Sequence, residues 1–304
     1  MSDIQVNLTE TGPAFSRIVS GVMTWGVWGK KYNTAEMQQL IEECVESGIS
    51  TFDHADIYGG YTTEEEWGKA LKASYIDRKD IQIITKCGIK LTTPNRPTYK
   101  IKSYDTSADH IQLSVENSLR YLQTDYIDLL LIHRPDPLLD PEAVAEVIEN
   151  LKGQGKVKWF GVSNFTKDQF ELLNSYTPLT TNQIEASLLH LEPLYDGTLD
   201  QCQQLLIRPM AWSPIGSGKI FDLEQKEILK IRAKADEICQ RYDNTFHVDQ
   251  LLLAWLMKHP SGILPVIGSG RIARIQKAIA ACDITITREE WFEMLEASRG
   301  HEIA

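Results

Sequence analysis

The feature that most constrains the fold of this chain is a regular alternation of short apolar runs with longer amphipathic segments. Eight runs are rich in β-branched residues and have the length of strands. Helical patterns separate them, so successive strands should pair in parallel through right-handed crossovers. Eight such units without a break predict an α/β fold, a (β/α)8 TIM barrel. The runs are 17–23, 49–53, 81–86, 126–133, 157–163, 179–185, 207–212 and 262–268.

Helix start signals and the chain ends complete this architecture. Three pairs have the spacing of a capping box, and a fourth places an N-cap before a first-turn proline: Asn33 and Glu36, Thr62 and Glu65, Thr166 and Gln169, Asp140 and Pro141. Two helical patterns within 219–262 predict extra C-terminal helices. The residues before the first run suffice for an N-terminal hairpin lid over the barrel bottom. We expect one domain over 1–304.

Composition narrows the class of partner. The formal charge of -11 and a pI near 5.2 argue against nucleic acid. No apolar run is long enough to span a bilayer, and residues 1–13 do not resemble a signal peptide. Five cysteines without a CxxC indicate reduced thiols, so we expect a cytoplasmic protein.

Polar side chains gather where the predicted strands end. In a barrel the C-terminal strand ends form one mouth, where the chemistry is carried out. The residues placed there, strand by strand, are Thr24 and Trp25, Asp53, Lys86, His133, Ser163 and Asn164, Gln183, Trp212 and Ser213, and Gly268 and Ser269.

Four of the residues expected near this mouth can hold or move a proton. Asp53, Lys86 and His133 follow apolar runs, and Tyr58 lies in the loop after Asp53. A lysine ammonium favours phenolate, which makes Tyr58 a candidate general acid, while His133 could donate a hydrogen bond to a substrate oxygen. Asp53 and Lys86 could instead form an ion pair that only stabilises the barrel. That alternative explains each residue singly but not the convergence of all four.

A metal site is the other chemical interpretation of this region. His54, Asp56 and His133 could be metal ligands, as in barrel hydrolases. Strand alternation, however, turns His54 away from the interior, and no HxH or HExxH motif is present. We therefore expect no metal.

Two glycine-rich loops follow the last two strands. The segment 268–273, GSGRIA, formally matches a dinucleotide fingerprint, although the acidic residue of that motif is missing. Arg271 and Arg274 add cations at a helix start, where main-chain N–H groups also favour a phosphate. Barrels often bind phosphate at the loops after strands seven and eight, which favours a phosphate site here. The alternative is that these loops are ordinary turns with exposed arginines.

Together these segments resemble the aldo-keto reductase superfamily over nearly the whole chain, and within it the YdhF-type oxidoreductases. The resemblance is carried by FDHADIYG (52–59), ITKCG (84–88), LLLIHRPD (129–136), GVSNF (161–165), TNQIE (181–185) and AWSPIGSGKIF (211–221). It implies an enzyme that reduces aldehyde or ketone carbonyls to alcohols by hydride transfer from NADPH. It departs from many members at Trp212, where tyrosine is common, and at Gly268, Lys277 and Ala278.

The resemblance also implies roles by position. Tyr58 would be the proton donor, Lys86 and Asp53 would lower its pKa, and His133 would orient the carbonyl. The expected cofactor contacts are Thr24, Trp25, Asp53, Ser163, Asn164, Gln183, Trp212, Ser213, Pro214, Ile215, Gly216, Ser217, Gly218, Gly268, Ser269, Arg271 and Arg274. The two arginines would meet the 2′-phosphate of NADPH.

The substrate is the least determined part of this hypothesis. Trp25, Trp28, Tyr58 and His133 would line an open pocket beside the long segment 87–107. We expect a small carbonyl substrate and a monomer or weak homo-oligomer. The alternative functions are a cofactor-sensing regulatory subunit of the same fold, similar to potassium-channel β subunits, and, more weakly, a metal-dependent barrel hydrolase.

Overall fold

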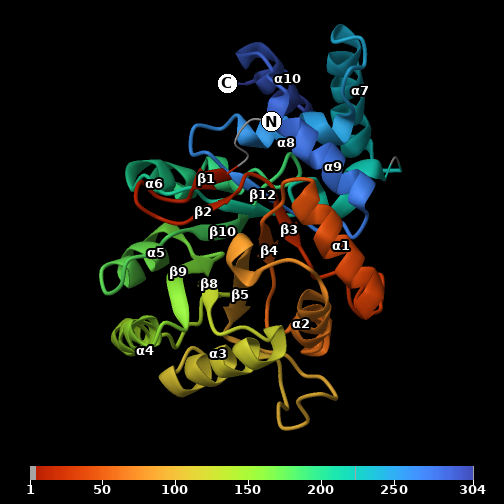
Figure 1. The fold of residues 1–304 in the computed structure, drawn as a ribbon. Coiled ribbons are helices and arrows are strands. Elements are labelled where there is room, and N and C mark those ends of the chain that lie inside the picture. The colour runs from red at the N-terminus through yellow and green to blue at the C-terminus, as the bar shows by residue number, and fades with distance from the viewer. Residues whose placement is uncertain (1–4, 223, 304) are drawn as a thin grey trace.

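Eight parallel strands close into a barrel in the computed structural model, which describes residues 5–222 and 224–303 (Figure 1). Each strand pairs with the next along the chain, and the last pairs with the first, which confirms the predicted (β/α)8 fold. The strands are β3 (Val19–Gly21), β4 (Thr51–Asp53), β5 (Gln82–Cys87), β8 (Ile127–Ile132), β9 (Val157–Ser163), β10 (Asn182–Glu185), β11 (Met210–Trp212) and β12 (Leu264–Ile267).

Helices surround the barrel and connect its strands (Figure 1). They are α1 (Thr34–Glu46), α2 (Thr63–Ala73), α3 (Ala108–Leu122), α4 (Pro141–Gly153), α5 (Lys167–Asn174), α6 (Thr198–Gln204), α7 (Lys226–Arg241), α8 (Val248–Met257), α9 (Ile272–Ala280) and α10 (Arg288–Arg299). The two helical patterns predicted within 219–262 are α7 and α8, which precede β12, and α10 follows β12 and packs against α7. Within residues 5–222 and 224–303, no helix is both long and apolar enough to cross a membrane.

Three of the four predicted helix starts are confirmed: the capping boxes at Asn33 and Thr166, and Asp140 before a first-turn proline. The capping box predicted at Thr62 is wrong. Thr62 has helical rather than extended dihedral angles, and its hydroxyl donates to the Gly59 carbonyl at 3.1 Å, so it does not cap the helix.

An N-terminal hairpin closes the barrel bottom, as predicted. Its strands β1 (Gln5–Asn7) and β2 (Ala14–Ser16) pair antiparallel. Leu8 and Phe15 are fully buried against side chains from the lower barrel interior. The main-chain N–H of Arg208 donates to the Leu8 carbonyl at 2.7 Å, which joins the hairpin to the segment before β11.

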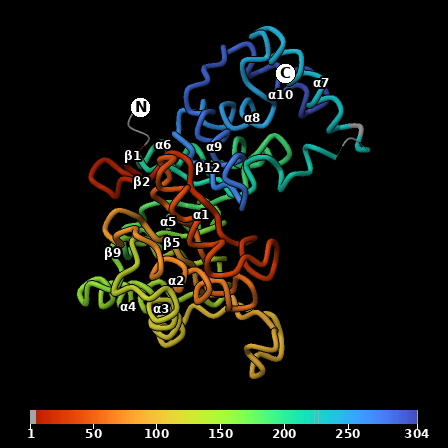
Figure 2. The backbone as a smooth tube through the Cα atoms, turned by 45° about the vertical axis from the view of Figure 1, so that its right-hand side comes forward, coloured from red at the N-terminus to blue at the C-terminus, as the bar shows by residue number. Residues whose placement is uncertain are grey.

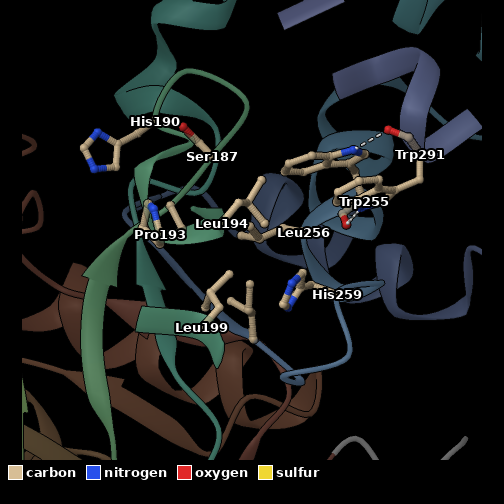
Figure 3. Close-up of a pocket in the computed structure, with 11 residues that line it drawn as sticks. Ser187, His190, Pro193, Leu194, Leu199, Trp255, Leu256, His259 and Trp291 are labelled. Atoms are coloured by element: carbon tan, nitrogen blue, oxygen red, sulfur yellow. Dashed lines mark hydrogen bonds between the residues drawn. The ribbon is translucent and has the colours of Figure 1, made fainter. Parts of the chain in front are cut away.

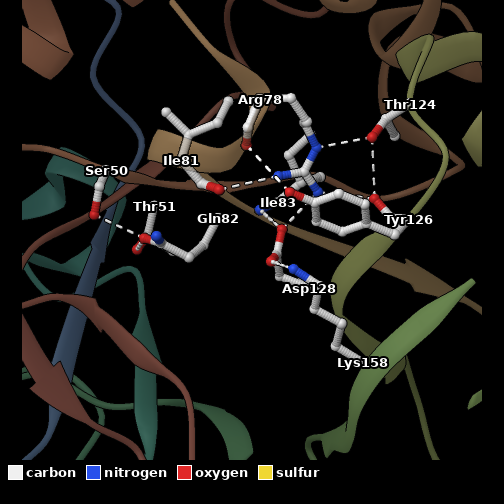
Figure 4. A network of polar contacts seen from close by, with 10 residues as sticks. All are labelled: Ser50, Thr51, Arg78, Ile81, Gln82, Ile83, Thr124, Tyr126, Asp128 and Lys158. Carbon is white, nitrogen blue, oxygen red and sulfur yellow. Dashed lines mark hydrogen bonds and ion pairs between the residues drawn. The ribbon is translucent and has the colours of Figure 1, made fainter. Parts of the chain in front are cut away.

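A polar network ties together the N-terminal ends of neighbouring strands (Figure 4). The Arg78 guanidinium donates to Asp128 at 2.6 Å and to the Tyr126 carbonyl at 2.8 Å, and it lies 3.9 Å from the Tyr126 ring centroid. Lys158 reaches the second Asp128 oxygen at 3.2 Å. These contacts stabilise the end of the barrel that lies opposite the C-terminal mouth.

A small cavity lies between α8, α10 and the segment after β10 (Figure 3). Trp255 and Trp291 stack beside it with ring centroids 5.0 Å apart, and each indole N–H donates to the other residue's carbonyl. The free space is about 10 Å³, room for one water at most. It is a packing defect rather than a ligand site.

The long segment after β5 projects beyond the barrel mouth (Figure 2). It contains a two-stranded ladder of β6 (Ile89–Lys90) and β7 (Ser103–Tyr104). Its Asn95 amide donates to the Gly60 carbonyl at 2.8 Å, and the Leu91 N–H donates to the Tyr61 hydroxyl at 2.9 Å. The segment thus packs against the loop that carries Tyr58.

Candidate active site

Strand alternation directs three of the predicted side chains into the barrel. Lys86 lies two residues beyond Ile84, and His133 lies two beyond Leu131. Ile84 and Leu131 belong to the buried interior cluster, so the polar side chains that share their face form the layer above it. Asp53 ends β4 and is also buried. The apolar interior therefore forms the floor of the site.

Lys86 is the centre of this polar layer. Its ammonium donates to Asp53 at 2.7 Å, to the His54 carbonyl at 2.7 Å and to the Tyr58 hydroxyl at 3.1 Å. All three donor positions of the ammonium therefore have a partner, which offsets the cost of burying a charge that is only 1% exposed. We call Asp53, Tyr58, Lys86 and His133 the tetrad.

A chain of hydrogen bonds leads from the tetrad to Trp212. The Gln183 amide donates to Asp53 at 2.8 Å, and the Ser163 hydroxyl donates to the Gln183 carbonyl at 2.8 Å. The Asn164 amide donates to the Ser163 hydroxyl at 2.7 Å and accepts from the Trp212 indole at 3.0 Å. Four predicted cofactor contacts therefore meet on one side of the mouth.

The protonation of Tyr58 differs from the sequence-based expectation. Burial raises the pKa of the phenol above its usual value, and the Lys86 ammonium opposes this shift without cancelling it. The predicted net lowering by Lys86 and Asp53 is therefore wrong, because the Asp53 carboxylate also raises the pKa of the phenol, and Tyr58 is protonated. Burial, followed by the charge of Lys86, lowers the pKa of His133 well below its usual range, so this imidazole is neutral.

His54 lies outside the mouth, as strand alternation predicts. It is fully buried, and its ring meets the Trp67 ring edge-on with centroids 4.5 Å apart. Asp56 is also buried, and burial raises its carboxyl pKa well above the usual range. Across residues 5–222 and 224–303, no group of three or more His, Cys, Asp or Glu side chains is arranged to hold a metal ion.

The loop after β11 curls back on itself. Ser213, Gly216, Ser217 and Gly218 have positive φ angles of 52°, 60°, 54° and 83°, and the Ser213 and Ser217 hydroxyls are 2.6 Å apart. A Cβ added at Gly218 would meet no atom within 4 Å, so the main chain faces open space there. Pro214 and Ile215 complete the turn. Such a loop can bring its main chain close to a phosphate.

Hydrogen bonds join the loop after β12 to the loop after β3. Thr24 donates to the Gly268 carbonyl at 2.7 Å, and the Trp25 indole donates to the Ser269 carbonyl at 3.2 Å. Trp25 is fully buried, and its indole supports this loop. Its role as a cofactor and substrate contact stays a prediction.

Two predicted residues remain free for a ligand at this loop. Arg271 and Arg274 are exposed at the start of α9, and neither forms an ion pair with a carboxylate of the described chain. Gly268 faces open space beside them. In the neighbouring loop after β3, Trp28 is 45% exposed, with its ring centroid 6.2 Å from that of Tyr58.

A family model for the aldo/keto reductase family matches residues 17–299. The chain belongs to this family. Its barrel, closed by an N-terminal hairpin, is the aldo-keto reductase fold, and the chain is an oxidoreductase.

Relatives match this aldo-keto reductase over almost its whole length. The oxidoreductase YdhF of Escherichia coli is 43% identical, with 98% of this chain and 99% of the relative covered. The 6-dehydroglucose reductase of Agrobacterium fabrum is 43% identical, with 95% and 96% covered. The solved structure of the thermostable aldo-keto reductase Tm1743 has a TM-score of 0.80 at 27% identity and covers 96% of this chain and 99% of that one.

Aldo-keto reductases use nicotinamide cofactors, and the residues here suit such a group. A dinucleotide needs amides for its carboxamide, an aromatic face for its ring and main-chain N–H groups or cations for its phosphates. Asn164 and Trp212 would provide the first two at the mouth. The open loop at Gly218 and the exposed Arg271 and Arg274 would provide the third.

Two residues that this aldo-keto reductase places at or behind its tetrad are not among those predicted from the sequence. Arg134 follows His133, and strand alternation gave no sign that its guanidinium lies at the mouth, 5.6 Å from the Trp212 ring centroid. Glu64 is part of a run of three glutamates that is typical of an exposed helix start. It is 3% exposed and accepts hydrogen bonds from Thr85 at 2.6 Å and Ser118 at 3.0 Å.

Proposed function

We propose that this aldo-keto reductase reduces aldehyde or ketone carbonyls to alcohols with NADPH, and that Tyr58 is the proton donor. The observation that carries the proposal is the position of the Lys86 ammonium, 2.7 Å from Asp53 and 3.1 Å from the Tyr58 hydroxyl. A structural ion pair alone would not require a phenol at that distance. The neutral imidazole of His133 lies edge-on to the phenol, with ring centroids 6.1 Å apart.

When bound, the nicotinamide supplies the hydride that the carbonyl carbon accepts. The carbonyl oxygen gains negative charge during this transfer and needs a proton as the charge develops. Tyr58 provides that proton, and its raised pKa keeps the phenol protonated before the reaction. The attraction of Lys86 for the phenol oxygen grows as phenolate forms, which favours the product side of the transfer. His133 donates a hydrogen bond that orients the oxygen.

The choice of NADPH over NADH rests on the two free arginines. Both lie in the first turn of α9 or at its N-cap, next to a loop with open main chain at Gly268. A guanidinium recognises phosphate oxygens through charge-assisted hydrogen bonds, and a bare ribose offers no such charge. Arg271 and Arg274 therefore support binding of a 2′-phosphate.

The substrate class is tested directly by following NADPH absorbance over a panel of carbonyls. The panel should contain aromatic, aliphatic and hydroxylated aldehydes and simple ketones. The hydroxylated aldehydes are included because two relatives bear the name 6-dehydroglucose reductase. We expect NADPH-dependent turnover of at least one aldehyde class and much weaker turnover with NADH. Absence of turnover across the panel, with NADPH still bound, would instead support the regulatory-subunit alternative.

The cellular setting stays a prediction. All five cysteines are free thiols, and burial raises the pKa of Cys44 and of Cys202 to about 12, so these thiols are unreactive near neutral pH. Detecting the protein in the separated fractions of cells checks the proposed cytoplasmic location.

A further inference from the structure

One cation at the mouth has no acidic partner. Arg134 follows the last residue of the tetrad, and one guanidinium nitrogen donates to the His133 carbonyl at 2.8 Å. The side chain is half-buried and lies over the edge of the Trp212 ring, 5.6 Å from its centroid. The His133 carbonyl accepts one N–H of the guanidinium, so the guanidinium keeps further N–H groups that can reach a ligand.

Arg134 makes no ion pair within 4.0 Å with any carboxylate in the part of the chain described. The charge of Glu185 acts on Arg134 from beyond that distance, and Glu185 is 4.0 Å from His190. Lys102, in the projecting segment, also lacks an ion pair among the described residues, and its charge acts on His133 as that of Arg134 does. Arg134 is therefore an unpaired cation beside His133 and Trp212.

Among the described residues Arg134 has fewer partners than Arg17 and Arg78, two other arginines that are partly buried. The formal charge is -11, and Arg78 pairs with Asp128 at 2.6 Å. Arg17, which also has no ion pair, donates to three main-chain carbonyls, whereas Arg134 donates to one. A guanidinium removed from water without a counter-ion is costly, and its burial lowers the pKa of Arg134. A bound anion would remove that cost.

We propose that the substrate carries a carboxylate in addition to its carbonyl group, and that Arg134 binds this carboxylate. The inference rests on the proposed carbonyl reduction and specifies its substrate class. The guanidinium forms a bidentate contact with the carboxylate, Lys102 adds longer-range attraction, and the carbonyl meets Tyr58 and His133. Arg134 is then the residue that sets specificity, while the tetrad carries the chemistry.

The test compares matched substrates with NADPH in the parent protein and in Arg134→Gln. 4-Carboxybenzaldehyde is the charged probe, benzaldehyde is its neutral counterpart, and glyceraldehyde is a neutral hydroxylated probe. We expect Arg134→Gln to lower kcat/KM for 4-carboxybenzaldehyde by about 10- to 100-fold, the range for a lost hydrogen bond to a charged group. The two neutral aldehydes should change by less than about threefold. Arg134→Lys should restore part of the loss, and Arg120→Gln, on the exposed face of α3, controls for net charge.

Two results would overturn the inference and leave the proposed reductase activity intact. An equal loss for glyceraldehyde and 4-carboxybenzaldehyde would make Arg134 a donor to neutral oxygens. An equal loss for all three aldehydes would mean that Arg134 only positions His133. Binding of 4-(hydroxymethyl)benzoate against benzyl alcohol, followed by tryptophan fluorescence, provides a readout without turnover. Equal affinities in the parent protein contradict the inference even if no aldehyde is reduced.

Discussion

The ammonium of Lys86 lies 3.1 Å from the hydroxyl of Tyr58 and donates a hydrogen bond to it. Lys86 is held in place by Asp53 and by the His54 carbonyl, so it cannot turn away from the phenol without losing two other partners. The phenol therefore has a fixed positive neighbour on its inner side. This geometry joins the ion pair of the barrel to a group that can transfer a proton.

Replacing Tyr58 with phenylalanine tests the acid directly. The change removes the transferable proton and little else, so kcat for carbonyl reduction should fall by about 10²–10⁴-fold. NADPH affinity should change little, because the phenol is not among the proposed cofactor contacts. Stopped-flow rates and a fluorescence titration measure the two quantities. Tyr75→Phe, at an exposed tyrosine remote from the mouth, is the matched control. A Tyr58→Phe protein with the parent rate would falsify this mechanism.

Replacing Arg271 and Arg274 with alanine tests cofactor choice. Each charge-assisted contact with a phosphate contributes about 1.5–3 kcal/mol, so the double variant should bind NADPH at least 10-fold more weakly. NADH has no 2′-phosphate, and its affinity should change by less than about threefold. Titration of both cofactors measures the difference, with Lys277→Ala on the exposed face of the same helix as control. Equal losses of affinity for NADPH and NADH would contradict the proposed contact of these arginines with the 2′-phosphate.

Glu64 predicts a pH dependence of stability. Burial raises its pKa from 4.5 to about 7, so the folded protein favours the protonated carboxyl more than the unfolded chain does. The stability that this group contributes is full below pH 4.5 and is lost as pH rises through about 7. Glu64→Gln stays uncharged and can still bond Thr85 and Ser118. The variant should therefore gain stability relative to the parent as pH rises.

Denaturant unfolding of both proteins from pH 4 to pH 8 measures this effect. The difference in unfolding free energy should change by about 3 kcal/mol over that interval, in order of magnitude. Titration of His133 and other groups is common to both proteins and cancels in the difference. Glu65→Gln, at the exposed neighbour, should show no comparable change. A pH-independent difference for Glu64→Gln would show that folding does not shift the pKa of this carboxyl.

Metal removal separates the reductase from the hydrolase alternative. The tetrad and a nicotinamide need no metal ion, so incubation with EDTA should leave carbonyl reduction unchanged. His54→Ala should lower stability, because it leaves a cavity beside Trp67. The same variant should keep its response to NADPH and carbonyl. Activity that is lost with EDTA and returns with zinc would favour the hydrolase.

The parts that the sequence predicts correctly depend on local periodicity. Strand alternation alone places Lys86 above Ile84 and His133 above Leu131, because a period of two fixes which side chains share a face. The eight strands follow from the same pattern and its helix signals. Asn33 and Thr166 cap their helices because the capping contacts lie within four residues of one another.

The features that the sequence does not predict depend on long-range packing. Trp25 is buried because β12 brings the Ser269 carbonyl beside it, 244 residues away in sequence. The net pKa of Tyr58 depends on how much water the folded barrel excludes, and the adjacent ammonium alone does not determine it. In the sequence Glu64 cannot be distinguished from the glutamates that follow it. Its burial results from the packing of α2 against α3. Each of these properties depends on residues that are far apart in the sequence, so no short segment predicts it.

The chain of bonds from Asp53 through Gln183, Ser163 and Asn164 to Trp212 has a thermodynamic consequence. The Asn164 amide already has a partner on each of its two polar atoms. Each atom nevertheless keeps one free position, because the amide nitrogen has a second N–H and the oxygen has a second lone pair. A carboxamide can therefore bind at Asn164 without breaking the chain, and the bonds already made fix the orientation of the amide beforehand, which lowers the entropy cost of association.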